Sequence, residues 1–292
     1  MIHAGFGLKK QFSLAKKNIY LTCSTKITSL QGYFIVTSTS KIYNNNRTNA
    51  RMVYLLLPAL FYILFGTFDA LAMLVLILKL YRMPLLKYKY RILLFVVCIS
   101  LFSYVVRVVL QIPKLDLPLQ YVFFFLFLRF GLRLKLHSGA FISGTGISAY
   151  ISIQLILFYL LNLAINIDRN VLNENTGGSV YVIQIVSILS AYLIAGLLKI
   201  YNGGFSFISE PPHDFMLQEN YGTKTNKVLL SGSILSFITI ILMVVMLYAM
   251  NPLMCIFLSL LTFGISYFLS DRGDYEDVRE AVELYRYGNK KR

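Results

Sequence analysis

The sequence predicts an all-α, polytopic integral membrane protein with about seven transmembrane helices. Of its 292 residues, 57% are hydrophobic and only 14% are charged, whereas a soluble domain carries about 25% charged residues. The mean hydropathy of the chain is +0.65. The apolar residues gather in runs of bilayer-spanning length, and at such lengths only helices satisfy their own backbone hydrogen bonds in lipid.

Six apolar runs have full spanning length, and a seventh is shorter. The six runs lie at about 53–78, 92–112, 138–165, 180–200, 228–248 and 252–269. The seventh, about 115–130, offers roughly 14–16 residues, whereas a bilayer core needs about 20. We still expect it to span, because Arg129, Arg133 and Lys135 follow it, and their long stems extend the effective length.

Basic residues are concentrated in alternate loops. The 79–91 loop carries five Lys or Arg and the 129–137 segment three, whereas the 113–116 loop holds one Lys and one Asp. Because basic loops face the cytoplasm, we expect the N-terminus outside and the C-terminus inside, with the 201–227 loop also cytoplasmic. We expect a bacterial plasma membrane, and the Lys-, Asn-, Ile- and Tyr-rich usage fits an AT-rich genome.

The chain divides into three predicted parts. Residues 1–51 form an extension with eight Lys or Arg and no Asp or Glu, residues 52–270 form the helical transmembrane domain, and residues 271–292 form a short charged cytoplasmic tail helix. An outside extension with eight positive charges contradicts the positive-inside rule. Met52 is therefore the expected true start, with a transit-like leader or a genuine cytoplasmic arm as alternatives.

The tail is different in kind from the apolar runs. Val278, Val282 and Tyr285 recur at i, i+4 and i+7, which is one stripe of an amphipathic helix. Asp274 is the expected cap of that helix. The stripe fits either a solvated helix that stops the last span from sliding or a helix that docks a partner.

The composition excludes several classes of function. The net charge of +15 comes mostly from positions at the ends of apolar runs, so we expect contact with membrane lipid and none with nucleic acid. The three cysteines, Cys23, Cys98 and Cys255, have no paired spacing that indicates disulfides or a zinc site. No metal, nucleotide or hydrolase motif is present, so we expect neither a cofactor nor enzymatic activity.

Two ionisable residues fall inside predicted spans, where a charge is costly and functional use is the default hypothesis. These are Asp69 and Arg107. Their estimated depths leave an axial gap of about 8 Å, so a direct ion pair is one interpretation. Arg107 also fits snorkelling to the outer headgroups, or an outward-facing pocket where its guanidinium meets an acidic ligand group.

The run at 138–165 carries polar amides on one helical face, namely Gln154, Asn162 and Asn166. Such amides act as glue between helices or line a polar substrate path. Gly139, Gly144 and Gly146 precede them, and this glycine pattern suits close helix packing or a broken helix. The candidate ligand-binding residues are therefore Arg107, Asp69, Gln154 and Asn162.

The order of these features resembles the membrane-sensor half of Gram-positive histidine kinases that detect secreted peptides. The resemblance covers residues 53–165 and rests on a basic loop, "ISLFSYVVRVVLQIPKLDLP", "FFFLFLRFGLRLKLHSGAF" and a long Gly/Ser-rich span. Residues 271–292 carry no phosphoacceptor His and no nucleotide-binding glycines. The resemblance therefore implies a sensor or accessory protein without the kinase module, with Arg107 facing the ligand.

The leading functional hypothesis is reception or accessory signalling for an extracellular peptide or small ligand. The signal would pass to a cytoplasmic partner through the 79–91 loop, the 201–227 loop or the tail. The alternative is a small transporter or an export or immunity protein, whose path would run past Asp69, Arg107 and the amides of the 138–165 span.

Overall fold

The computed structural model describes residues 59–166, 171, 177–208, 224–249 and 251–290. These residues all belong to one unit, Pro58–Arg292. Within the described part, helices are joined by turns and no strand occurs, which confirms the all-α prediction. The extension 1–51 and the expected start at Met52 lie outside the described residues.

Six helices are long and apolar enough to cross a membrane. They are Ala59–Leu80, Leu86–Val109, Leu136–Ile165, Gly178–Ile200, Asn226–Tyr248 and Pro252–Glu276. Each coincides with one of the six full-length apolar runs of the sequence. Large apolar side chains cover the outer faces of these helices, with Leu94, Leu163 and Phe268 at least 64% exposed. Such faces need an apolar solvent, so this chain is a polytopic membrane protein.

The labelled elements follow the chain in order. They are η1 (Leu86–Tyr88), α3 (Lys89–Tyr104), η2 (Val105–Val109), η3 (Pro113–Leu115), α4 (Asp116–Leu126), η4 (Phe127–Gly131), α5 (Leu136–Ile165), α6 (Gly178–Ile200), α7 (Lys224–Tyr248) and α8 (Pro252–Lys290). The short seventh run thus forms a helix, α4 continued by η4, that is shorter than the other six.

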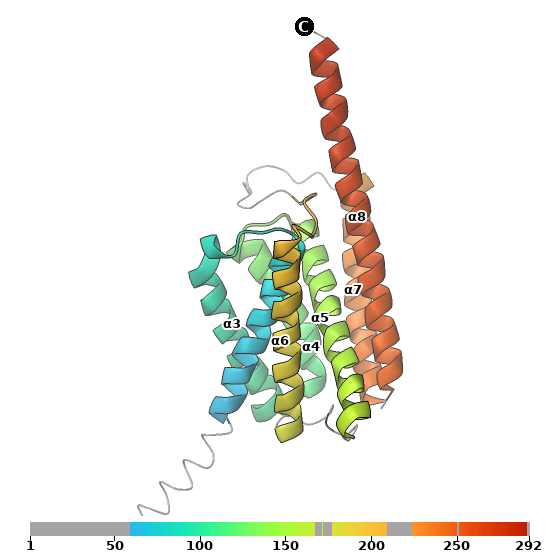
Figure 1. The fold of residues 1–292 in the computed structure, drawn as a ribbon. Helices are drawn as coiled ribbons and strands as arrows, with labels where there is room; N and C mark the ends of the chain where they lie inside the picture. The colour runs from blue at the N-terminus through green and yellow to red at the C-terminus, as the bar shows by residue number, and fades with distance from the viewer. Residues whose placement is uncertain (1–58, 167–170, 172–176, 209–223, 250, 291–292) are drawn as a thin grey trace, which may run out of the picture. The chain divides into compact units, whose positions relative to one another are not determined.

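Successive helices run in alternate directions (Figure 1). The backbone N–H of Phe205, after α6, donates to Leu80 O over 2.8 Å at the end of the first helix. Arg91 Nη1, early in α3, donates to Gly131 O at the end of η4 over 2.7 Å. These contacts gather the connections 81–88, 132–135 and 201–208 at one end, which we name the basic end.

Charge is distributed unequally between the two ends. The basic end carries Lys79, Arg82, Lys87, Lys89, Arg91, Arg129, Arg133, Lys135 and Lys199. At the opposite end, the charged side chains of the described residues are Arg107, Lys114 and Asp116. Most of the largest fully buried side chains also lie toward the basic end: Leu74, Ile77, Leu78, Tyr81, Leu128, Leu132, Leu134, Phe141 and Ile142.

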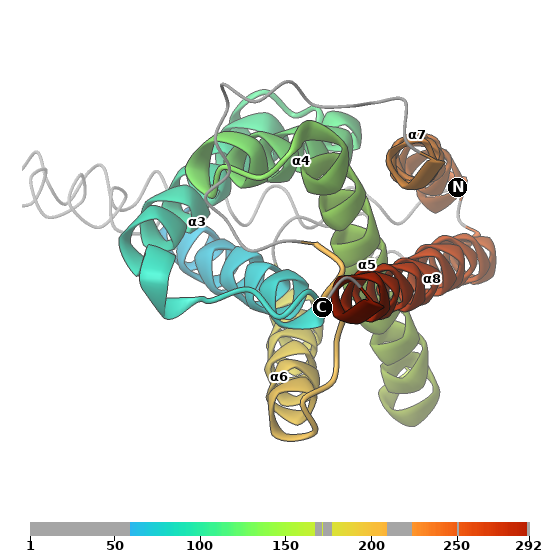
Figure 2. The same cartoon turned by 90° about the horizontal axis from the view of Figure 1, so that it is seen from above.

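Helix α5 is the centre of the packing. It contacts α4, α6, α7 and α8, and Figure 2 shows it between α3 and α6 on one side and α7 on the other. A Cβ added at Gly146 would lie 2.0 Å from Ile77 Cγ1, and one at Gly144 would lie 2.5 Å from Ser236 Cβ. The glycines therefore serve close packing, and α5 is unbroken from Leu136 to Ile165.

Helices α3 and α4 end in the same way. Each passes into one π-helical turn that contains an arginine, Arg107 in η2 and Arg129 in η4. In each case a residue with positive φ follows four positions later, Gln111 at 56° and Arg133 at 61°. A π turn widens the helix and redirects its side chains, and such turns are frequent at functional sites.

Helix α8 does not stop at the end of its apolar part. It is continuous from Pro252 to Lys290 and extends past the other helices at its C-terminal end (Figure 1). The expectation that Asp274 caps the start of a separate tail helix is wrong, because Asp274 lies within α8. Its Oδ1 instead accepts hydrogen bonds from Ser206 N and Phe207 N, both at 2.7 Å. The helix continues through the charged tail because this segment contains no Pro and no two adjacent Gly residues.

Candidate functional site

The charged pair at the opposite end joins Arg107 of η2 to Asp116 of α4. Arg107 Nε donates to Asp116 Oδ2 over 2.6 Å. The same oxygen accepts from Gln120 Nε2 at 2.9 Å and from Ser103 Oγ at 3.1 Å. The side chain of Asp116 is fully buried, whereas that of Arg107 is 34% exposed. One carboxylate oxygen thus gathers three donors, an arrangement that offsets the desolvation of a buried charge.

Local sequence explains why these groups meet. The π turn of η2 carries Arg107 at the end of its helix, and Pro113 begins η3 in the short connection that reverses the chain. Asp116 is the first residue of α4, where the partial positive charge of a helix N-terminus favours a carboxylate. Gln120 stands one turn later on the same face.

Asp69 does not pair with Arg107, the partner that the depths estimated from the sequence allowed. Its Oδ1 accepts a hydrogen bond from the hydroxyl of Tyr150 in α5. The interpretation in which Asp69 pairs directly with Arg107 is wrong, because the nearer Asp116 takes the guanidinium. Tyr62 is connected to Asp116 through Ser103, since its hydroxyl lies 3.3 Å from Ser103 Oγ and Ser103 donates to Asp116.

These polar groups surround a cavity of about 100 Å³, which we name the polar cavity. Its polar lining residues come from five helices and are Tyr62, Asp69, Ser100, Ser103, Arg107, Asp116, Gln120, Tyr150, Gln154 and Gln184. Gly66 and Ala70, two small residues one turn apart on the first helix, also line it. Two carboxylates, one guanidinium and three amides line it, and because ionisable groups are costly inside a membrane domain, this cavity is the candidate functional site.

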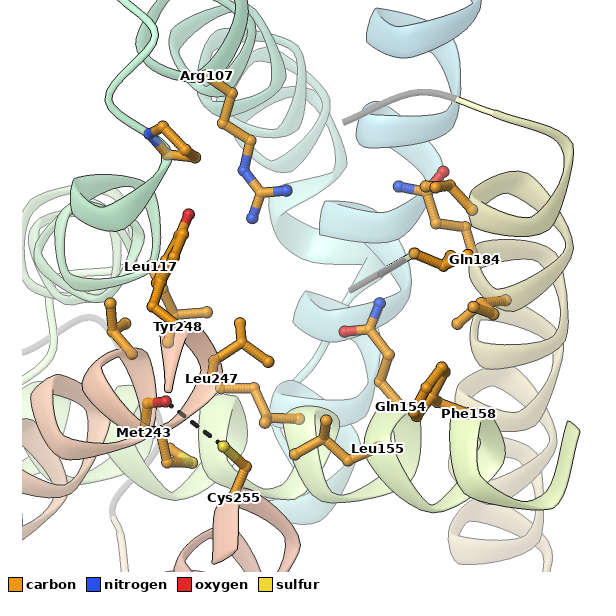
Figure 3. A pocket seen from close by; sticks show the side chains of 16 residues that line it. Arg107, Leu117, Gln154, Leu155, Phe158, Gln184, Met243, Leu247, Tyr248 and Cys255 are labelled. Carbon is orange, nitrogen blue, oxygen red and sulfur yellow. Dashed lines mark hydrogen bonds between the residues drawn. The ribbon is translucent and has the colours of Figure 1, made fainter. Parts of the chain in front are cut away.

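A second cavity of about 170 Å³ adjoins it, which we name the apolar cavity. Its walls are mostly aliphatic or aromatic, from Leu155, Phe158, Ile183, Met243 and Leu247, together with Tyr248 and Cys255. The two cavities share Arg107, Leu117, Ile151, Gln154 and Gln184. In Figure 3, Arg107 and Gln154 reach into the apolar cavity from opposite sides, and Cys255 Sγ donates to Met243 O over 3.5 Å. An apolar chamber with polar groups at one boundary is the usual composition of a small-molecule site.

Two buried oxygens at the polar cavity have no hydrogen-bond partner among the described residues. They are Asp116 Oδ1 and Gln184 Oε1. Buried polar atoms are normally satisfied by protein, water or ligand. Both atoms are hydrogen-bond acceptors, so a group that satisfies them must donate.

The structure brings most of the sequence candidates together. Asp69, Arg107 and Gln154 all line the polar cavity, whereas Asn162 lies two turns beyond Gln154 on α5 and lines neither cavity. Asn166, on the same predicted face, is the left-handed C-cap of α5. Within the described residues, no cluster of three His, Cys, Asp or Glu could hold a metal.

Sequence reasoning missed the centre of the site. Asp116 had been assigned to a short loop, and Tyr150 and Gln120 had not been singled out, because a loop carboxylate and a span tyrosine are ordinary features. One signal was available. Asp116 and Gln120 are four residues apart in "LDLPLQYVF", which places them on one face at the start of a helix.

Comparisons with protein-family models, with curated proteins and with solved structures found no match to this chain. The class of the protein therefore rests on its own features: a polytopic bundle of apolar helices that encloses a polar, charged cavity.

Proposed function

We propose that this chain is a sensor or accessory signalling protein of a bacterial plasma membrane, and that it binds an extracellular ligand in the two adjoining cavities. The observation that carries the proposal is their position. The cavities occupy the half of the bundle that contains Arg107 and Asp116, whereas large, fully buried side chains fill the half toward the basic end.

The proposal includes seven membrane crossings. Helix α4 with η4 covers 16 residues, Asp116–Gly131, or about 24 Å at 1.5 Å per residue. It runs between α3 and α5 in the alternating order of the bundle (Figure 1). The chain must return from the end of η2 to the start of α5, so a short crossing here supports the seventh span.

The orientation follows from charge. The nine Lys and Arg named above at the basic end favour a cytoplasmic location for that end. The cavities then lie toward the outer surface, as a receptor for an extracellular ligand requires. The C-terminal part of α8, with its i, i+4 pairs Arg272–Glu276 and Arg279–Glu283, would extend into the cytoplasm.

Helix α8 is the proposed route to a cytoplasmic partner. Cys255 of α8 lines the apolar cavity, and the same helix continues to Asp274, which is bonded to Ser206 and Phe207. A displacement of α8 by ligand would therefore change the contact between α8 and the segment after α6. Rigid helices that move as units carry such coupling.

A transporter is the second candidate. It is favoured by Asp69, which lines the polar cavity at mid-depth and accepts a hydrogen bond from Tyr150. A transporter must open the inner half, so Asp69→Asn would abolish flux while assembly is retained. A sensor needs no such opening, and its signalling would depend on the C-terminal part of α8.

The test is extraction of bound molecules after purification in mild detergent, read by mass spectrometry. Wild type is compared with Gln154→Leu, which removes an amide shared by both cavities, and with the matched control Asn162→Leu on the same helix. We expect a peptide or small molecule to leave with wild type and the control and to be depleted in Gln154→Leu. Equal extracts from all three proteins would reject ligand binding in these cavities.

The sensor and the transporter are then separated by function. Loss of signalling on removal of residues 274–292, with the extracted ligand retained, supports the sensor. Loss of ligand flux in vesicles that carry the Asp69→Asn variant supports the transporter, provided that removal of residues 274–292 has no effect.

A further inference from the structure

We infer that the polar cavity receives a protonated primary amine, and that the apolar cavity takes the apolar part of the same ligand. The inference rests on the proposed function and names the class of ligand. It begins with Asp116 Oδ1 and Gln184 Oε1, the two buried acceptors without a partner in the described structure. A ligand that satisfies them must bring hydrogen-bond donors.

Three donors of the cavity are engaged by one carboxylate oxygen. Arg107 Nε, Gln120 Nε2 and Ser103 Oγ all donate to the other oxygen of Asp116, Oδ2. The Tyr150 hydroxyl donates to Asp69. An acidic ligand group would meet two carboxylates against one guanidinium, so an acidic ligand group at Arg107, one of the interpretations from the sequence, is not favoured at this cavity.

The charges that line the polar cavity also favour a cationic ligand. The described lining of the polar cavity contains two carboxylates, Asp69 and Asp116, against one guanidinium. Asp116 is fully buried, and the guanidinium that balances it is partly exposed. A cation of one charge would balance the second carboxylate, and the low dielectric of the site strengthens that attraction.

Size and shape limit the ligand further. The polar cavity of about 100 Å³ admits an ammonium head group but no bulky polar body. The apolar cavity of about 170 Å³ opens beside it, with Leu155, Phe158 and Leu247 in its walls. The ligand class is thus an amphiphilic primary amine, such as the N-terminus of a hydrophobic peptide or an alkylamine.

Two other occupants supply related chemistry. Water satisfies lone acceptors in a polar cavity of this size, but it leaves the charge unbalanced. A sodium or potassium ion balances the charge and is bound by oxygen atoms alone. An ammonium group differs from both because it combines charge with directed N–H donors and carries an apolar tail.

The experiment compares n-butylammonium with n-butyltrimethylammonium by thermal unfolding of the purified full-length protein in detergent, at constant ionic strength. Both probes have the same charge and tail, but only the first has N–H donors. Sodium chloride and 1-butanol are the further arms. We expect n-butylammonium alone to raise the unfolding temperature, because binding to the folded state stabilises it.

Variants connect the effect to the cavity. Gln184→Met removes an acceptor that has no partner in the described structure, so folding is retained and affinity for n-butylammonium falls about tenfold. Asp69→Asn and Asp116→Asn should weaken binding further. Asp271→Asn makes the same chemical change at an exposed residue of α8 and should leave the affinity unchanged.

Several outcomes would overturn the inference. Equal stabilisation by both butyl probes would indicate adsorption of the tail without recognition of the amine. Stabilisation by sodium but not by n-butylammonium would assign the cavity to a metal ion. No response to any cation would leave water as the occupant.

Failure here is separable from failure of the proposed function. If Gln154→Leu depletes an extracted ligand while n-butylammonium has no effect, ligand binding stands and the amine assignment falls. If n-butylammonium binds while no extracted ligand depends on Gln154, the amine site stands and the sensor proposal falls.

Discussion

Arg107 and Asp116 form an ion pair with an Nε to Oδ2 distance of 2.6 Å, nine residues apart in sequence and on two different helices. The pair explains how an arginine is tolerated within an apolar run. Its charge is met by a fully buried carboxylate, which is itself held by Ser103 and Gln120. Neither snorkelling to the headgroups nor pairing with the more distant Asp69 is needed to explain Arg107.

Removal of one member of this pair should be costly. We expect Asp116→Ala to lower the free energy of unfolding by about 3 kcal/mol, because it leaves the Arg107 charge largely desolvated. The double variant Arg107→Met/Asp116→Ala should cost less than the sum of the two single variants, by about 1–3 kcal/mol. Unfolding in detergent, followed by circular dichroism, measures both quantities. Strict additivity would show that the two side chains do not interact.

The glycines of α5 provide a test of packing. We expect Gly146→Ala to lower the free energy of unfolding by about 1–3 kcal/mol, because its Cβ would lie 2.0 Å from Ile77 Cγ1. The matched control is Gly264→Ala on α8, where a Cβ meets nothing within 4 Å. The control should be neutral or stabilising by up to about 1 kcal/mol, since Ala favours helix over Gly.

The same unfolding assay decides the outcome for the glycines. The double variant Gly146→Ala/Ile77→Ala should cost less than the sum of the two single variants, because Ala at position 77 has no Cγ1 to clash. Equal stability of Gly146→Ala and Gly264→Ala would contradict close packing between α5 and the first helix.

Asp274 should hold the segment after α6 in place. Its Oδ1 accepts from Ser206 N, Ser206 Oγ and Phe207 N. We expect Asp274→Ala to increase amide hydrogen exchange over 205–208 by about tenfold, as the loss of about 1.5 kcal/mol of local protection implies. Asp271→Ala, at an exposed position three residues earlier, is the control. Unchanged exchange in Asp274→Ala would mean that α8 does not anchor this segment.

Membrane orientation can be tested by cysteine labelling. With Cys23, Cys98 and Cys255 replaced by Ser, single cysteines are introduced as Lys114→Cys and Lys87→Cys. A membrane-impermeant maleimide should label the first in intact cells and the second only after lysis, because basic loops face the cytoplasm. Labelling of Lys87→Cys in intact cells would invert the topology and place the cavities toward the cytoplasm.

Much of the fold was predictable because the signals are local. Each of the six long apolar runs became a helix with bounds within a few residues of those expected, except that the last one continues to Lys290. A span is recognisable from about 20 consecutive residues, and the arrangement of neighbours does not alter it. The continuity of the last helix across residue 270 was not predictable, because a charged sequence without Pro continues a helix as readily as it begins a new one.

The class of the protein, the composition of its helices and the rare charged groups within them were all predictable from the sequence. Tertiary structure alone decided the pairing of those groups. Asp69 and Arg107 were visible as intramembrane charges, but their partners Tyr150 and Asp116 depend on helix rotation, on the π turn of η2 and on the tight return into α4. The reason is that hydropathy is a property of one continuous segment. A hydrogen bond between two segments forms only when tertiary packing brings donor and acceptor to about 3 Å.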